Sequence, residues 1–313
     1  MDMLPVKSTG FKYVDGLTYT AVPFTENVGG KVQEFACDCP ESTLFALIKK
    51  RLLSDVDIEI LQLLFKYKFL NYYNIAYYLD NVSTKIKRKK DYSSNLARLR
   101  RNGLIVMYST NTEPDCLRCY TLSSGGFCGI SFFNGYKVEK KPLKIPSVKD
   151  SVKALAINQF AIMALSSLQT IHVDLKKSVK NYPKFDAVIT LPATEPFLKS
   201  MQTTIVLMCV RRYPDWQSYI KLGLINYIKA SKTFKDQVPI IVILAEDYDH
   251  MLEISETIIK EECEHLMDNI LFTNDIRVVN KDLTNHYLFD KFYSVAFDPQ
   301  VKKIRFVSKK IIY

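Results

Sequence analysis

The sequence predicts an α/β protein, α+β overall, in which an N-terminal winged helix-turn-helix precedes a C-terminal mixed-sheet α/β domain. Three observations support this prediction. The length of 313 residues suits about two domains. Residues 52–135 read as three short amphipathic helices followed by two strands, and residues 148–313 alternate strand-like and helical segments. Between them, residues 136–147 carry clustered lysines and two prolines, which is typical of a linker.

Residues 1–50 are predicted to form an N-terminal extension. The segment from Phe11 to Val22 alternates apolar and polar residues around Asp15-Gly16, which indicates a β-hairpin. Ser42 or Thr43 is expected to cap a short helix that runs through Arg51.

The pattern sharpens at Ser54, which precedes acidic residues and an apolar stripe and so predicts a helix from about Asp55 to Tyr67. A second helix is expected over Tyr72–Leu79, and a third from near Asp91 to Gly103, a glycine suited to the position after a helix end. Two strands and a turn are then expected, at Leu104–Tyr108, Leu117–Leu122 and Ser124-Gly125-Gly126.

The C-terminal half should begin with a long helix over Val148–Ser167. Strands are predicted at Thr170–Leu175, Phe185–Leu191, Thr203–Val210, Val238–Leu244, Ser294–Phe297 and Lys303–Val307. Helices are predicted at Trp216–Ser231 and Tyr248–Asp268. Strands with intervening helices favour a mixed sheet.

The charge balance favours an anionic partner. The net charge is +10, and residues 1–150 carry 22 basic and 15 acidic side chains, a net of +7. The seven cysteines are odd in number and scattered, the N-terminus lacks a signal-peptide pattern, and no apolar run would span a membrane. These features predict a reduced, cytoplasmic protein without a membrane partner.

A basic run coincides with the third helix, and the sequence therefore predicts duplex DNA as the partner. Asn95 could form a bidentate pair with adenine and Arg98 with guanine, while the lysines before the helix could contact phosphates. The predicted DNA-binding residues are Lys85, Lys87, Arg88, Lys89, Lys90, Ser93, Ser94, Asn95, Arg98 and Arg101. The alternative is a solvated basic loop beside three helices that serve only for packing.

Three segments carry a family resemblance: LSDVDIEILQLLFKYKFLNYYNIAYYLD from Leu53, NLARLRRNGLI from Asn95, and CYTLSSGG from Cys119. Over about residues 52–130 the chain resembles the replication-relaxation family of plasmid and mobile-element proteins, which have a MarR-like winged helix. The resemblance implies a role in plasmid replication or DNA relaxation. It also implies a C-terminal half similar to the restriction-endonuclease fold. Its other implied partners are a second copy of the chain or replication and relaxosome proteins.

A nuclease of that class needs an Asp on one strand and an acid-x-Lys on the next, which hold Mg²⁺ and orient water. Asp186 and Lys221 are candidate relics, since Lys221 begins a Lys-Leu-x-x-x-x-Tyr pattern typical of the family. The next strand offers only Met208 and Cys209 where the acid belongs, and Arg211 where the Lys belongs. The prediction is therefore a non-catalytic scaffold with no metal and no cofactor, and Asp186 is otherwise an ordinary solvated acid.

Other candidate sites are weaker. Cys37, Cys39, Cys116 and Cys119 could form a zinc site, but the two pairs are far apart in sequence. His250 and His265 are expected to be solvated partners of nearby acids, and Trp216 to be a half-buried core residue rather than a partner anchor. Two other functions stay open: a transcriptional regulator with an oligomerisation or sensor domain, and a Mg²⁺-dependent nuclease.

Overall fold

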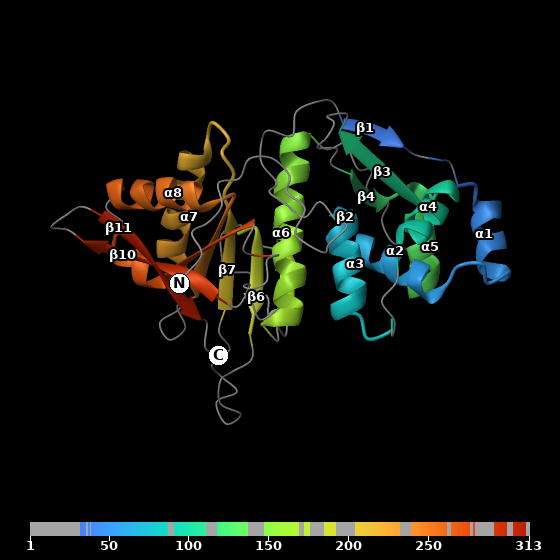
Figure 1. Cartoon of the computed structure of the whole chain (residues 1–313). Coiled ribbons are helices and arrows are strands. Elements are labelled where there is room, and N and C mark those ends of the chain that lie inside the picture. Colours follow the sequence, from blue (N-terminus) through green and yellow to red (C-terminus); the bar gives the residue numbers. More distant parts are fainter. Residues whose placement is uncertain are drawn as a thin grey trace, which may run out of the picture. The chain divides into compact units, whose positions relative to one another are not determined.

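The computed structural model is an α/β protein of helices and two sheets, and its chain forms two compact units (Figure 1). The residues it describes are 32–35, 37, 39–86, 91–110, 118–136, 147–168, 172–175, 185–191, 204–231, 239–261, 264–275, 278, 291–298 and 303–310. We call Asn27–Asn158 the N-terminal unit, and the unit that contains Gln159–Tyr313 the C-terminal unit. The boundary falls within one helix, α6 (Val148–Ser167).

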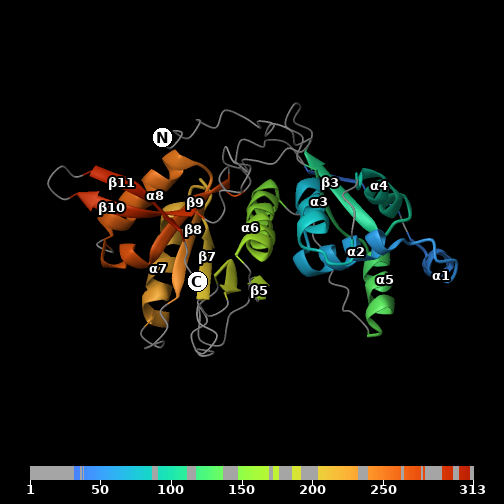
Figure 2. The same ribbon diagram turned by 60° about the horizontal axis from the view of Figure 1, so that its bottom comes forward.

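The described residues of the N-terminal unit form five helices, the start of α6 and a small antiparallel sheet. Its helices are α1 (Glu41–Lys49), α2 (Asp55–Tyr67), α3 (Tyr72–Asn81), α4 (Ser93–Arg101) and α5 (Ser124–Asn134). The sheet order is β1-β3-β4-β2, with β1 (Val32–Phe35), β2 (Leu70–Asn71), β3 (Ile105–Thr110) and β4 (Arg118–Leu122). Figure 2 shows α2, α3, α4 and α5 gathered around β3.

Local sequence explains where these helices begin and end. Ser54 and Asp57 form a capping box at the start of α2, and Asn71 and Asn74 form one at the start of α3. Helix α4 ends at Arg101, and Gly103 two residues later has a φ of 67°, which glycine adopts most readily. The amides of Gly103 and Leu104 donate to the carbonyls of Arg100 and Leu99, which satisfies the last turn of α4.

Several predictions for this unit are confirmed and several are wrong. The helices at 55–67 and 72–81 and the hairpin of β3 with β4 agree with the predictions. The prediction of a turn at Ser124-Gly125-Gly126 is wrong, because Ser123 caps α5 there. The two glycines let α5 approach the backbone closely, since a Cβ at Gly126 would lie 2.1 Å from the carbonyl oxygen of Leu104.

The first fifty residues also differ from the prediction. Helix α1 begins after Pro40, and neither Ser42 nor Thr43 caps it. Strand β1, which pairs antiparallel with β3, was not predicted. The predicted hairpin at 11–22 and most of the predicted linker, 137–146, lie outside the described residues.

The C-terminal unit is built on a seven-stranded mixed sheet of order β11-β10-β9-β8-β7-β6-β5. The strands are β5 (His172–Leu175), β6 (Ala187–Thr190), β7 (Thr204–Cys209), β8 (Ile240–Ala245), β9 (Ile270–Asn274), β10 (Lys291–Asp298) and β11 (Lys303–Lys310). β7, β8 and β9 run parallel, and the other neighbours are antiparallel. The parallel strands are connected by α7 (Trp216–Ser231) and α8 (Tyr248–Lys260).

Both crossover helices cover one face of this sheet. Met208, Ile243 and Phe272 from the three parallel strands pack with Ile220 of α7 and Ile254 of α8 in one buried core. The long helix α6 and the α7 prediction are confirmed. The predicted helix Tyr248–Asp268 is too long, because α8 stops at Lys260 and a 3-10 turn, η1 (Glu264–Asn269), follows. Strand β9 was not predicted.

Candidate nucleic-acid interface and buried charge network

Helix α4 is the centre of the predicted DNA interface, and its first turn is fixed by Asp91. The Asp91 carboxylate accepts bonds from the Ser93 amide at 2.9 Å and from the Ser93 hydroxyl at 2.7 Å. It also accepts a bond from the Tyr72 hydroxyl of α3 at 2.7 Å. These bonds lower the pKa of Asp91. The single acid of the basic run therefore holds the start of α4 against α3.

Asn95 and Arg98, the two residues predicted to contact bases, both bind Asp57 of α2. The Asn95 amide donates to one carboxylate oxygen at 2.9 Å, and the Arg98 guanidinium forms an ion pair with the other. Asp57 is fully buried, whereas the Arg98 side chain is 42% exposed. Asp57 thus connects the capping box of α2 with the first two turns of α4, and both α4 side chains are engaged within the protein.

The remaining residues of the predicted interface divide into three groups. Lys85 pairs with Glu59 at 2.8 Å and donates to Gln62 at 3.1 Å, and the bond to Glu59 raises its pKa. Ser94 and Arg101 are exposed on α4, and the Ser93 hydroxyl binds Asp91. Lys87, Arg88, Lys89 and Lys90 lie outside the described residues.

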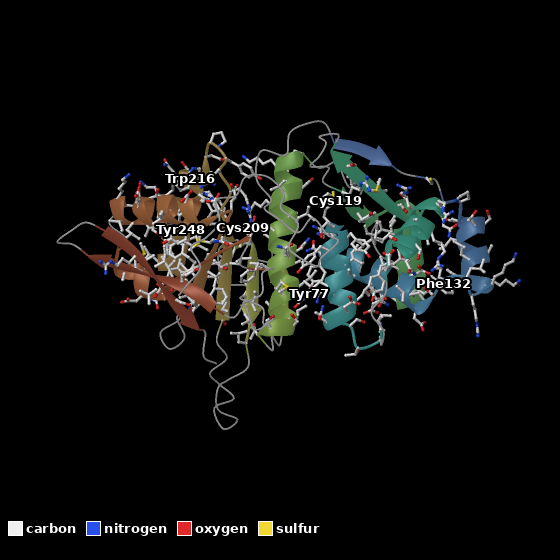
Figure 3. All side chains as sticks on the ribbon, in the orientation of Figure 1. Tyr77, Cys119, Phe132, Cys209, Trp216 and Tyr248 are labelled. Carbon is white, nitrogen blue, oxygen red and sulfur yellow. The ribbon has the colours of Figure 1, made fainter. Side chains whose placement is uncertain are left out.

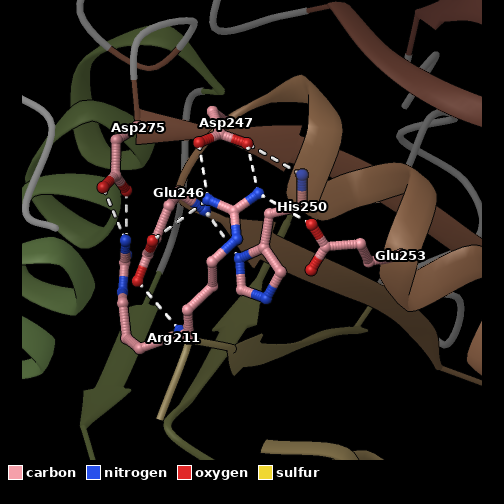
Figure 4. Close-up of polar contacts among 7 residues, drawn as sticks. Arg211, Glu246, Asp247, His250, Glu253 and Asp275 are labelled. Carbon is pink, nitrogen blue, oxygen red and sulfur yellow. Dashed lines mark hydrogen bonds and ion pairs between the residues drawn. The ribbon is translucent and has the colours of Figure 1, made fainter. Parts of the chain in front are cut away.

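The C-terminal unit contains a second set of paired charges, at the carboxyl ends of β7, β8 and β9 (Figure 4). Arg211 follows β7 and is fully buried, with a bidentate ion pair to Asp275 that includes a contact of 2.8 Å. Burial acts to lower the pKa of Arg211, but the negative charge of Asp275 holds this pKa well above its usual value. The Arg211 guanidinium also donates to the Cys209 sulfur at 3.2 and 3.3 Å.

The neighbouring Arg212 is directed to other acids. It contacts Asp247 at 2.7 and 2.9 Å, Glu253 at 3.2 Å and Glu246 at 3.4 Å. Its backbone amide also donates to Glu246 at 2.9 Å. Burial raises the pKa of Glu246 to about 7, while the bonds from Arg212 lower the pKa of Asp247 despite its partial burial. The two arginines are therefore neutralised by acids on the next strand ends and on α8.

His250 lies within this network and is not the solvated residue that the sequence suggested. It is fully buried on α8, and its Nδ1 accepts a long bond from the Glu246 amide at 3.4 Å. Burial and the nearby arginines lower its pKa to about 3, so it is neutral at pH 7. Trp216 stands perpendicular to it with ring centroids 5.4 Å apart, as a half-buried core residue. His265 stands in η1.

The two candidate nuclease relics have separate partners. Asp186 precedes β6, and its carboxylate accepts bonds from the Cys209 amide at 2.7 Å and the Tyr219 hydroxyl at 2.6 Å. Burial and Asp186 together raise the pKa of Tyr219. Lys221 instead pairs with Glu261 at 2.6 Å. Asp186 is therefore not simply solvated, since it ties the β6–β7 hairpin to α7.

Metal sites find no support in the described part of the chain. Within it, no group of three His, Cys, Asp or Glu side chains is placed to hold a metal ion. Cys37 is exposed, Cys119 is buried and donates to the Tyr108 carbonyl, and Cys116 lies outside the described residues. No helix among these residues combines the length and apolar character that a membrane span requires.

Comparison of the chain with protein-family models, with curated proteins and with solved structures finds no match to any of them.

Proposed function

We propose that the protein binds duplex DNA through its N-terminal unit, with α4 as the helix that enters the major groove. One observation carries this proposal: the N-terminal unit holds nearly all of the excess positive charge. Its 21 basic and 12 acidic residues give a net of +9, out of +10 for the whole chain. A concentrated positive charge attracts the phosphate backbone and supplies affinity that does not depend on sequence.

The arrangement around α4 supports the winged helix-turn-helix interpretation. α4 follows α2 and α3 and precedes the antiparallel pair β3 and β4, which is the order expected for a recognition helix and a wing. The helix has three arginines in its last turn and no acid in its first. Ser94 and Arg101 are exposed. Asn95 and Arg98 would have to leave Asp57 before they could contact bases.

We propose that the C-terminal unit has a nuclease-like fold but serves as a scaffold and not as an enzyme. Asp186 lies beside β7, because its amide donates to Leu207, but β7 offers no second carboxylate. A divalent cation needs several oxygen ligands, and Asp186 is already engaged with Cys209 and Tyr219. In this proposal the protein is a replication or relaxation factor of a plasmid or mobile element.

A salt titration of duplex binding tests the proposal. Replacement of Lys87, Arg88, Lys89 and Lys90 by alanine should weaken binding to every sequence and reduce the slope of log K against log salt by about four. A matched control replaces Lys229 and Lys260, two lysines of the C-terminal unit, and should leave the slope unchanged. An unaltered slope in the fourfold variant would remove the basic run from the interface, and Mg²⁺-dependent nicking that Asp186→Ala abolishes would make the unit a nuclease.

A further inference from the structure

Helix α1 exposes an aromatic side chain between two charges of opposite sign. Phe45 is 64% exposed, and Glu41 and Lys49 are exposed on either side of it. Residues four apart lie on one face of a helix, so these three side chains form a single stripe. The opposite face carries the buried Leu44 and Leu47. The exposed stripe is therefore the solvent side of a helix that is already packed.

Several exposed apolar side chains belong to α1, to α5 or to the residues that follow them. Of the seven large hydrophobic residues that are most exposed in the described part of the chain, four belong to α1, to α5 or to the residues just after them. They are Phe45, Leu52, Phe132 and Tyr136. α5 packs against α1, and Phe132 is labelled on it in Figure 3. Large apolar side chains that stay exposed on neighbouring helices are candidates for a surface that binds another protein.

The charges around Phe45 are symmetric in position and opposite in sign. Glu41 lies four residues before Phe45 and Lys49 four residues after it, about 6 Å along the helix axis in each direction. In an antiparallel pair of α1 helices with a two-fold axis at Phe45, Glu41 of each copy faces Lys49 of the other. A parallel pair would instead place Glu41 beside Glu41 and Lys49 beside Lys49. The stripe is thus complementary to itself in one orientation only.

We propose that α1 is a homodimerisation helix, which pairs antiparallel with α1 of a second copy of this chain through Phe45. An isologous contact of this kind is the commonest way in which soluble proteins form dimers. The aromatic contact supplies most of the affinity, and the two symmetry-related ion pairs set the orientation. No ion pair among the described residues engages Glu41 or Lys49, so both are available to the partner.

Sedimentation velocity on the full chain, without DNA, tests the apolar part of the contact. The wild-type protein should sediment as a dimer. Phe45→Ser should weaken association at least thirtyfold, as expected for a central aromatic anchor. Leu222→Ser is the matched control, since Leu222 is 59% exposed on α7, and it should not change the dimer. A monomeric wild type, or a dimer that survives Phe45→Ser, would overturn the proposal.

Charge reversal tests the orientation without removing any apolar contact. Glu41→Lys and Lys49→Glu should each weaken association roughly tenfold, because both symmetry-related pairs become repulsive. A mixture of the two single variants should form heterodimers, and the double variant should recover the wild-type association. A double variant as weak as the single variants would exclude the antiparallel register. Since no DNA is present, these results are independent of the proposed function.

Discussion

Two buried aspartates, Asp57 in the N-terminal unit and Asp275 in the C-terminal unit, each pair with an arginine, but the two arginines differ in exposure. Arg98 is 42% exposed and shares Asp57 with Ser54 and Asn95. Arg211 is fully buried and meets Asp275 in a bidentate pair. A positive charge in the sequence is therefore available to an external partner only where the acid that pairs with it leaves it open to solvent.

The same difference sets the energetic cost of losing each arginine. Without Arg98, Asp57 would still accept bonds from the Ser54 amide and hydroxyl and from Asn95. Without Arg211, Asp275 would remain buried without the guanidinium that neutralises it. An uncompensated buried charge is far more costly than a partly solvated ion pair that is lost.

The largest effect is therefore expected for Arg211→Met. We predict that it lowers the free energy of unfolding by about 3–5 kcal/mol, because it removes the guanidinium that pairs with a buried carboxylate. Urea denaturation of the purified variant measures this directly. The double variant Arg211→Met/Asp275→Leu should recover most of the loss, since it removes both charges and leaves an apolar pair. If the double variant is as unstable as Arg211→Met, lost packing rather than the loss of the ion pair is the cause.

Local signals predicted much of the fold. Ser54 and Gly103 mark the start of α2 and the end of α4, and the apolar periodicity of about residues 148–167 predicts α6. The failures come from tertiary context. β9 is only five residues long and follows a 3-10 turn, and its pairing with β8, which identifies it as a strand, exists only in the folded chain. The glycines at 125 and 126 read as a turn because only the folded chain brings the Leu104 carbonyl against them.

The candidate sites were less predictable, because charge partners are distant in sequence. The structure joins Arg98 to Asp57 across 41 residues and Arg211 to Asp275 across 64. A sequence pattern locates a run of basic residues on a helix, but it does not identify the acidic residue that pairs with each of them in the folded chain. Glu246 and Asp247 directly follow β8, and polar residues at the end of a buried parallel strand were the available signal for this network.

A smaller effect on stability is expected from the titration of Glu246 and His250, which lie in the charge network around Arg211 and Arg212. Burial raises the pKa of Glu246 to about 7 from the ordinary value of 4.5. Between these values the folded protein binds more protons than the unfolded chain, so this group makes stability fall as pH rises. The buried His250, with its pKa of about 3, acts in the opposite sense and makes stability rise with pH up to about 6.5.

The variant Glu246→Gln isolates the first of these effects, because glutamine keeps an acceptor for the Arg212 amide. Relative to wild type, we expect the variant to gain about 2 kcal/mol of stability between pH 5 and pH 8. Urea midpoints measured at several pH values in one buffer series give the difference. A difference that stays constant with pH would show that Glu246 is already ionised at pH 5.

The smallest effect is expected for Arg98→Met, the counterpart of Arg211→Met in the N-terminal unit. The variant should lose only about 1 kcal/mol of stability, because Asp57 keeps three other hydrogen bonds.

If Arg98 holds α4 on α2, the ratio of specific to non-specific DNA affinity of Arg98→Met should stay within about threefold of wild type. If Arg98 leaves Asp57 to bind guanine, the free energy of discrimination against another base should fall by about 1–3 kcal/mol at one base position. Arg101→Ala, on the exposed end of α4, serves as the control and should weaken all duplexes alike. A loss of 3 kcal/mol or more in the stability of Arg98→Met would erase the contrast with Arg211, and would show that solvent exposure does not protect this pair.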